Sequence, residues 1–374
     1  MRPLRIILAA GGTGGHVFPA LAAASALHGR GHRVVIATDV RGRQFESDIE
    51  TATVVASGLS GNPGEKLLGA LTIARGVLQA WRLIGRGRAD VVVGFGGFPS
   101  LPTMIAAILR GRATVIHDQN AVLGRVNRKL ASRVTCIATA FPAVRGVQAE
   151  QATYVGNPVR RQIAAIGARP YAAPQAEGPI AVLIFGGSQG ARVLSAVLPA
   201  ALAALPAPIK ARLSIVQQCR PEDLPAVEAA YRDAGLQAEL AAFFGDMPQR
   251  LAAAHLVIAR AGASTVAELA AAGRPAILIP FAAALDDHQT ANASALVEAG
   301  GAWRIAEADA TPERLAAEIE RILSAPDGLA AAAAAALTAG RPDAAEALAD
   351  LIQTAAKPSD GRGGRSTAIR GIAA

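Results

Sequence analysis

Short runs of apolar residues alternate with segments of helical periodicity along the whole chain. In the first half, strands are predicted at Leu4–Ala10, Arg33–Thr38, Val91–Gly94, Thr114–His117 and Val134–Ile137. In the second half they are predicted at Ile180–Phe185, Leu213–Gln217, Leu256–Ala259, Ala276–Pro280 and Ala302–Ile305. Near-continuous Val, Ile and Leu runs are typical of parallel strands buried on both faces beneath helices. We therefore predict an α/β fold built from βαβ units.

The chain of 374 residues is longer than one hydrophobic core usually supports, so two domains are expected. Residues 167–179 are rich in Gly and Pro and lack periodicity, which indicates a linker. The predicted domains are therefore residues 1–166 and 180–356, with the last helix of the chain returning to the first domain. Residues 357–374 have little apolar pattern and are predicted to form a disordered tail.

A glycine-rich turn follows a predicted strand twice, at Gly11–His16 and at Gly186–Arg192. In each copy, glycines surround a hydroxyl residue and a helical pattern comes next. A buried strand, a glycine turn and a helix start together bring backbone N–H groups close to a phosphate. The two copies predict two similar domains that face one ligand-binding cleft.

The first copy admits several interpretations. A P-loop would need Gly-Lys-Ser/Thr where His16 and Val17 stand. A dinucleotide fingerprint that begins at Gly12 has Val17 at its third glycine position, although Asp39 follows the second strand as that motif requires. A tight structural turn, or a turn that admits a large ligand, also remains. Because imidazole titrates near neutral pH, His16 is the candidate for acid–base chemistry; the alternative is a structural histidine at a helix start.

Three further segments follow predicted strands: the glycine cluster Gly94–Ser100 and the polar segments His117–Asn120 and Arg260–Glu268. Glycines and polar residues at the carboxyl ends of parallel strands lie where α/β sheets bind ligands. In the third segment a helix begins near Ser264, whose N–H groups and dipole suit a diphosphate. Glu268 then lies about one turn inside the helix and can accept both hydroxyls of a ribose. The alternative is a capping pattern in which Ser264 caps the helix and Glu268 is solvated.

Composition and charge narrow the classes of partner. The chain is 52% hydrophobic and 18% charged, which indicates a globular protein. Residues 1–160 hold 19 Lys and Arg against 8 Asp and Glu, whereas the remaining residues hold 18 against 21. The basic first half predicts an anionic partner, unless it only reflects an arginine-rich genome. Aromatic residues make up 4% and do not alternate with basic ones, so we expect no nucleic acid and favour an anionic membrane surface.

Residues 66–88 form a predicted helix with two apolar stripes. Leu78 and Trp81 belong to one stripe, and covering a sheet needs only one. Because Arg82 and Arg86 are among the basic residues that flank the spare stripe, we predict an interfacial membrane contact; the alternative is a helix buried on two sides. No apolar run approaches the ~20 residues that span a bilayer, so a soluble or peripheral protein is expected.

Six motifs in sequence order resemble one known family. They are Gly11–His16, Gly94–Phe98, His117–Asn120, Gly156–Arg160, Gly186–Arg192 and Arg260–Glu268. Together they resemble the MurG family, the lipid II-forming N-acetylglucosaminyltransferases of glycosyltransferase family 28, over about residues 4–350. The resemblance implies a GT-B fold, in which two Rossmann-like parallel-sheet domains enclose a central cleft.

The same resemblance implies an activity and a location. The activity is inverting transfer of N-acetylglucosamine from UDP-N-acetylglucosamine to the muramyl 4-hydroxyl of lipid I, the undecaprenyl-pyrophosphate-linked acceptor. The product, lipid II, serves peptidoglycan synthesis, cell shape and division. The implied location is the cytoplasmic face of the bacterial inner membrane, as a peripheral protein. The family implies no cofactor and no metal, and the acidic segment Asp286–Gln289 has no standard metal-ligand spacing.

The resemblance also implies roles for residues of this chain. His16 is the expected general base and Asp118 the second candidate. Binding of UDP-N-acetylglucosamine is implied for Thr13, Gly14, Gly15, Asn120, Arg160, Ser188, Phe244, Ala263, Ser264, Thr265, Val266, Ala267, Glu268 and Gln289. The membrane and the acceptor would meet Leu78, Trp81, Arg82 and Arg86. The chain departs from the usual family pattern at Asp118, where Glu is common, and at His288, where Gln is common.

Two other functions use similar folds. A UDP-N-acetylglucosamine 2-epimerase would need neither an acceptor motif nor a membrane patch. A non-catalytic nucleotide-sugar binder would leave His16 and the glycines of the first domain without a role. A nicotinamide-dependent enzyme is disfavoured by the broken fingerprint at Val17.

Overall fold

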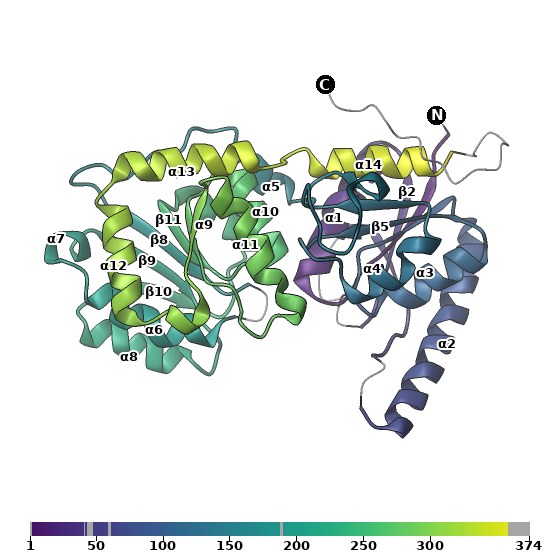
Figure 1. Ribbon diagram of the computed structural model, residues 1–374, viewed down its shortest axis with the longest axis horizontal. Helices are drawn as coiled ribbons and strands as arrows, with labels where there is room; N and C mark the ends of the chain where they lie inside the picture. Colours follow the sequence, from purple (N-terminus) through teal and green to yellow (C-terminus); the bar gives the residue numbers. More distant parts are fainter. Residues whose placement is uncertain (1, 41, 43–47, 59–60, 188–189, 358–374) are drawn as a thin grey trace.

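The computed structural model describes residues 2–40, 42, 48–58, 61–187 and 190–357. Two α/β domains lie side by side, each with its own parallel sheet (Figure 1). The predicted α/β class is thus confirmed. The predicted disordered tail falls almost wholly on residues outside those described, as does Ser188.

The first domain contains, among the described residues, a seven-stranded sheet in the order β3-β2-β1-β4-β5-β6-β7, in which neighbouring strands pair in parallel. Its strands are β1 (Arg5–Ala9), β2 (Arg33–Thr38), β3 (Glu50–Thr53), β4 (Val91–Gly94), β5 (Ala113–Asp118), β6 (Cys136–Thr139) and β7 (Thr153–Tyr154). Its helices are α1 (Gly14–Gly29), α2 (Pro63–Gly87), α3 (Ser100–Leu109) and α4 (Arg125–Leu130), whereas the short α5 (Arg161–Ala164) packs on α9 (Met247–Ala253) and α10 (Ala263–Ala272) of the second domain. One core joins the sheet to α1, and a second core joins its other face to α2 and α3. The central strands are therefore covered on both faces, as their apolar runs require.

The second domain contains, in the described part of the chain, a six-stranded parallel sheet in the order β10-β9-β8-β11-β12-β13. Its strands are β8 (Ile180–Phe185), β9 (Leu213–Gln218), β10 (Ala238–Ala241), β11 (Leu256–Ala259), β12 (Ala276–Leu278) and β13 (Ala302–Arg304). Its helices are α6 (Arg192–Ala203), α7 (Ala207–Lys210), α8 (Leu224–Asp233), α9 (Met247–Ala253), α10 (Ala263–Ala272), α11 (His288–Glu298), α12 (Pro312–Leu323) and α13 (Pro326–Ala339). Both faces of this sheet again carry a buried apolar core.

The chain crosses back to the first domain near its end. Helix α13 packs on α10, whereas the next helix, α14 (Ala344–Ala355), packs on α1 (Figure 1). Leu348 and Ile352 of α14 are completely buried in the core of the first domain. The two domains are thus joined by two stretches of chain.

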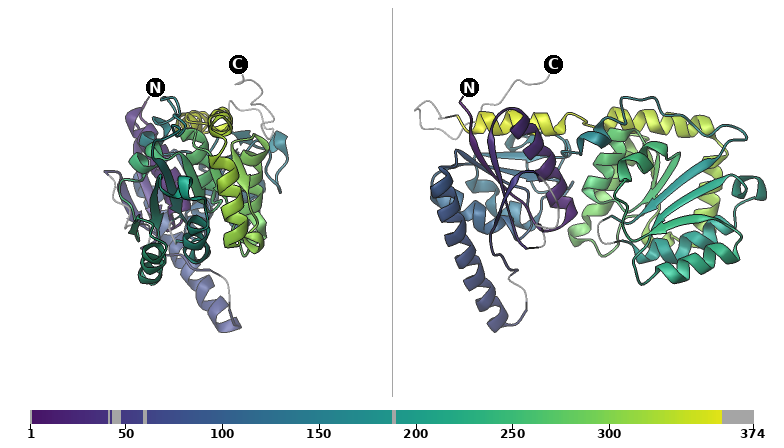
Figure 2. Two further views of the ribbon diagram at one scale, coloured as in Figure 1. Left: turned by 90° about the vertical axis from the view of Figure 1, so that its left-hand side faces the viewer. Right: turned by 180° about the vertical axis from the view of Figure 1, so that it is seen from behind.

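Helix α2 projects from the body of the first domain (Figure 2). It begins at a capping box, in which the Asn62 side chain accepts from Glu65 N while the Glu65 carboxylate accepts from Asn62 N. Its inner face packs closely, because a Cβ at Gly76 would collide with the Val55 carbonyl and Pro102. By length and composition alone α2 could cross a membrane, and so could the strongly bent pair of α12 and α13–α14. Arginines interrupt the apolar residues of α2, so the helix reaches this average hydropathy without a continuous apolar run.

Candidate functional site

The carboxyl ends of the parallel strands in the two sheets lead into loops that meet where the domains touch, here called the domain junction. Gly15, at the start of α1, accepts a 3.4 Å hydrogen bond from the Ser264 hydroxyl at the start of α10. Fully buried Asn292 of α11 accepts from Ala121 N at 2.8 Å and donates to the Asn120 side chain at 3.1 Å. The start of α1 is therefore in contact with the start of α10, and the loop after β5 is in contact with α11.

His16 lies in the first turn of α1, which begins at Gly14 after the extended residue Thr13. Its Nδ1 lies 2.8 Å from the Phe95 carbonyl and 3.2 Å from the Gln119 side-chain oxygen. Burial lowers the pKa of His16 below its usual value, although the nearby Asp118 carboxylate opposes that shift. The imidazole is therefore neutral near pH 7 and able to accept a proton.

Glycines surround the ring of His16. Gly96 and Gly97 both have left-handed backbone conformations, with φ of 82° and 73°. A Cβ at Gly97 would lie 3.5 Å from His16 Nε2, and one at Gly11 would lie 3.2 Å from Cδ2. The glycines after β1 and β4 thus keep side chains away from the edge of the imidazole.

Asp118, the second predicted base, is almost completely buried at the end of β5. Its carboxylate accepts from Asn120 N at 3.1 Å, from Gly124 N at 2.7 Å and from the Asn127 side chain at 2.9 Å. These bonds fold the loop between β5 and α4 around the carboxylate. The geometry favours a structural use of this side chain.

Arg160 and Glu268 join the two domains by a two-pronged ion pair. The Arg160 Nε donates to Glu268 Oε1 at 3.0 Å, and its Nη2 donates to Oε2 at 3.1 Å. The Glu268 side chain is only 12% exposed, and burial raises its pKa although Arg160 opposes the shift. The guanidinium also lies 5.1 Å from the centre of the Phe18 ring. Such bidentate pairs fix orientation as well as charge.

The other residues predicted to bind the donor are distributed over the second domain. Ala263–Ala267 form the first turn of α10, whose Gly262 cap has no side chain to bond the first N–H groups. Gln289, at the start of α11, accepts from Phe281 N at 2.9 Å. The buried Phe244 ring lies 4.1 Å beneath the Arg250 guanidinium. Within the described residues, no hydrogen bond or ring contact ties Phe244 to the rest of this group.

Sequence reasoning gave no individual role to three residues whose hydrogen bonds organise this region. Gln119 was visible in the polar cluster after β5, but its contact with His16 depends on how β4 and β5 pair. Asn292 carried no signal, because a single Asn inside a helical pattern is usually solvated. Within the second domain, Arg260 donates to the Ile279 and Pro280 carbonyls and pairs with Glu307 at 2.5 Å, which ties the end of β11 to the segments after β12 and β13.

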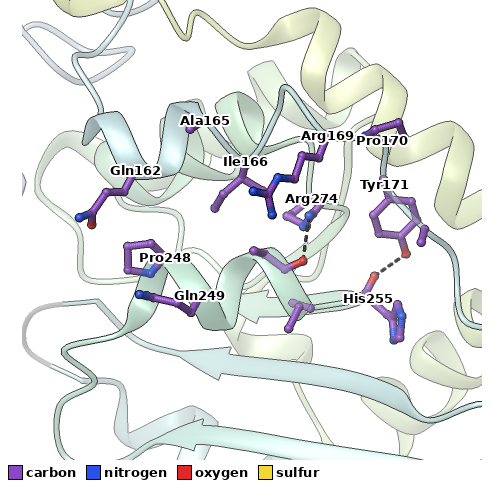
Figure 3. Close-up of a pocket in the computed structure, with 14 residues that line it drawn as sticks. Gln162, Ala165, Ile166, Arg169, Pro170, Tyr171, Pro248, Gln249, His255 and Arg274 are labelled. Carbon is purple, nitrogen blue, oxygen red and sulfur yellow. Dashed lines mark hydrogen bonds between the residues drawn. The ribbon is translucent and has the colours of Figure 1, made fainter.

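Two cavities lie outside this arrangement. One of about 490 Å³ lies between the chain after α5 and helix α9 (Figure 3). There Arg274 donates to backbone carbonyls and the Tyr171 hydroxyl donates to the His255 carbonyl at 2.8 Å. A second cavity, of about 1220 Å³, lies between the domains beside α10. Of the residues predicted to bind the donor, only Val266 and Ala267 line it. Among the described residues no cluster of His, Cys, Asp or Glu is arranged to hold a metal ion.

The spare stripe of α2 is solvent-exposed. Leu78 is 49% and Trp81 37% exposed, and Arg82 and Arg86 are exposed beside them. The Trp81 ring lies 4.1 Å from the guanidinium of Arg110, the residue that follows α3. Further toward the free end of the helix, large apolar side chains are more exposed still: Leu67, Leu68 and Leu71. Ile84 of α2 is buried in the core of the first domain, so the helix has one face packed on the domain and one apolar, basic face exposed to solvent.

Comparisons with known proteins identify relatives along nearly the whole chain. The model described as the glycosyltransferase family 28 N-terminal domain matches residues 6–139, and that of the C-terminal domain matches residues 181–348. A Paramagnetospirillum magneticum protein named UDP-N-acetylglucosamine–N-acetylmuramyl-(pentapeptide) pyrophosphoryl-undecaprenol N-acetylglucosamine transferase is 52% identical over 358 residues, covering 94% of this chain and 96% of the relative. A Rhodospirillum rubrum protein of the same name is 50% identical, covering 95% and 92%.

A solved structure supports the same relationship. The crystal structure of Acinetobacter baumannii MurG has a TM-score of 0.76 with this chain at 32% identity, covering 94% of this chain and all of the other. The predicted GT-B arrangement of two Rossmann-like domains is thereby confirmed.

Proposed function

The chain belongs to glycosyltransferase family 28, and from that premise we propose that it transfers N-acetylglucosamine from UDP-N-acetylglucosamine to the muramyl 4-hydroxyl of lipid I, forming lipid II. The relatives at about half identity carry the name of this transferase. The observation that carries the proposal is the pairing, across one junction, of a neutral imidazole with an uncapped helix start. A nucleotide-sugar transferase needs a base for the acceptor and a site for a departing diphosphate.

In the proposed reaction, the 4-hydroxyl oxygen of the acceptor attacks the anomeric carbon of the donor sugar. The bond from that carbon to the diphosphate oxygen breaks, and its electron pair leaves with UDP. Negative charge therefore grows on the diphosphate while the sugar becomes oxocarbenium-like. The N–H groups of Ala263, Ser264 and Thr265 and the positive end of the α10 dipole stabilise that charge where it develops.

His16 is the proposed general base, which takes the proton of the 4-hydroxyl as the new bond forms. Its lowered pKa and its position among glycines support this role. Asp118 remains the second candidate, but its carboxylate already accepts three hydrogen bonds, from Asn120 and Gly124 of the loop after β5 and from Asn127 of α4. Because the carboxylate already accepts these three hydrogen bonds, it has less freedom to reach the acceptor hydroxyl.

Glu268 is proposed to bind the ribose hydroxyls of the donor, with Arg160 beside it. Thr13, Gly14, Gly15 and Asn120 would complete the donor site from the first domain. Phe244 would line the uracil site, Gln289 would contact the sugar, and Ser188, which lies outside the described residues, would contact the diphosphate.

The exposed face of α2 is proposed to lie on the anionic cytoplasmic surface of the inner membrane, where lipid I is anchored. Its apolar side chains would enter the headgroup region while Arg82 and Arg86 meet lipid phosphates. Leu78→Ser combined with Trp81→Ser should weaken flotation with vesicles that contain anionic lipid. Leu337→Ser, at an exposed leucine of α13 in the other domain, is the matched control. Unchanged flotation of the double variant would contradict this contact.

The activity is tested by incubating the purified protein with UDP-N-acetylglucosamine, with and without a lipid I analogue. We expect UDP release only when the acceptor is present. Conversion of the donor to its manno epimer without acceptor would identify an epimerase instead. Tight donor binding with no turnover under either condition would identify a nucleotide-sugar binder.

A further inference from the structure

The hydrogen bonds around His16 determine which ring nitrogen carries the proton. The Phe95 carbonyl, 2.8 Å from Nδ1, can only accept a hydrogen bond, so Nδ1 must donate. The Gln119 amide nitrogen donates to the same carbonyl at 2.8 Å. That bond turns the amide oxygen of Gln119 toward Nδ1, where it is a second acceptor at 3.2 Å. Both neighbours of Nδ1 are therefore acceptors, and the neutral ring has its lone pair on Nε2.

The free nitrogen faces space that only glycine leaves open. A methyl group at Gly97 would lie 3.5 Å from Nε2, and within the described residues no side chain or carbonyl is hydrogen-bonded to it. Nε2 is thus the atom of His16 that can reach a hydroxyl of a substrate.

We propose that Gln119 is a positioning residue that holds His16 in the Nδ1–H tautomer and does so without charge, so that Nε2 acts as the base. The proposal rests on the transferase function, but the tautomer itself does not. In the reaction, Nε2 takes the proton of the acceptor 4-hydroxyl as that oxygen bonds to the anomeric carbon. The ring becomes an imidazolium, with Gln119 and the Phe95 carbonyl still accepting from Nδ1–H.

An uncharged orienting group has a chemical consequence. In Ser-His-Asp triads, a carboxylate at Nδ1 stabilises the imidazolium. Here an amide occupies that place, and the charged or titratable groups facing His16 are Asp118 and His117 from β5 and His288 from α11. Burial, the largest influence, and His288 oppose protonation of His16, whereas Asp118 and the hydrogen bonds to Gln119 and to the Phe95 carbonyl favour it. The ring is consequently neutral before the acceptor arrives.

The first test measures the tautomer directly and does not depend on activity. Nitrogen-15 NMR of histidine-labelled protein near pH 7, with His16→Ala to assign the signal, should show a protonated Nδ1 and an unprotonated Nε2 for His16. An Nε2–H signal for His16 would overturn the proposal even if the protein is an active transferase. If the expected signal is seen but the protein has no transferase activity, the tautomer is established and the proposed function is refuted.

The second test changes the charge of the orienting group. Gln119→Glu keeps the shape of the side chain but places a carboxylate at Nδ1, so the acid limb of the kcat–pH profile should move up by about one pH unit or more. Gln249→Glu, at an exposed position of α9, adds the same charge elsewhere and should leave the profile unchanged. An unmoved acid limb in a folded, active Gln119→Glu variant would overturn the role of Gln119. If that variant does not fold, the nitrogen-15 NMR measurement of the His16 tautomer in the wild-type protein still tests the proposal.

Discussion

The two edges that meet at the domain junction hold their functional groups by opposite means. The edge of the first domain presents a neutral imidazole, His16, between glycines and uncharged acceptors. The edge of the second domain presents a carboxylate, Glu268, whose charge is balanced by Arg160 of the other domain, and beside it the positive end of α10. One edge is built to receive a proton and the other to bind charged and hydroxyl groups. Variants of the two edges should therefore affect different kinetic constants.

Removing the imidazole should have the largest effect. His16→Ala should lower kcat by ~10²–10⁴-fold, because a positioned base typically supplies that factor. Binding of UDP, measured by calorimetry, should be almost unchanged. His28→Ala, at an exposed histidine of the same helix, is the control and should behave as wild type. A kcat close to that of wild type would exclude His16 as the base and break the contrast between the edges.

Adding one methyl group beside the imidazole should have the next effect. Gly97→Ala places a Cβ 3.5 Å from Nε2, so kcat should fall by roughly 10²-fold through a misplaced acceptor. Its left-handed backbone also costs about 1–2 kcal/mol of stability. Gly111→Ala has the same backbone strain with open space around it, which separates the two effects. Equal kcat values for the two variants would show that the space at Gly97 is not used.

A change at the opposite edge should instead weaken donor binding. Glu268→Gln keeps the shape but removes the charge, so the Kd for UDP-N-acetylglucosamine should rise by about 10–100-fold, the value of a hydrogen bond to a charged group. The kcat at saturating donor should change much less. Glu320→Gln, on the exposed face of α12, is the control. A loss in kcat with unchanged donor affinity would reverse the assignment of the two edges.

The smallest effect is expected where the edges influence each other. His288 of the second domain lowers the pKa of His16, because two like charges would repel. His288→Gln removes that repulsion, so the pKa of His16 should rise and the acid limb of the kcat–pH profile should move to higher pH. The shift should be smaller than that of Gln119→Glu, since His288 is the weakest of the influences on His16. A downward shift would contradict the electrostatic description of the junction.

The central strands of both sheets could be predicted from sequence, whereas three strands at sheet edges could not. Strands β1, β4, β8 and β11 are continuous apolar runs because helices cover both of their faces. The missed strands, β3, β7 and β10, are short edge strands with polar residues such as Glu50, Thr153 and Glu239. Their conformation comes from pairing with a neighbour, which a local pattern does not record.

The candidate site shows the same division. His16 and Glu268 were identifiable because each follows a glycine turn at a strand end. The Arg160–Glu268 pair and the contact of Gln119 with His16 were not, since each joins residues about a hundred positions apart. Such contacts depend on how strands and domains are placed in space, and only the structure supplies that placement.

The return of α14 to the first domain has a consequence for how the protein is made. Leu348 and Ile352 fill the core between α1 and the first sheet, yet they are among the last described residues of the chain. During translation, domains generally fold as units from the N-terminus. Here the domain that leaves the ribosome first lacks part of its interior until the second domain has been synthesised. Apolar side chains of α1 stay uncovered during that interval, so the first domain reaches its finished state last.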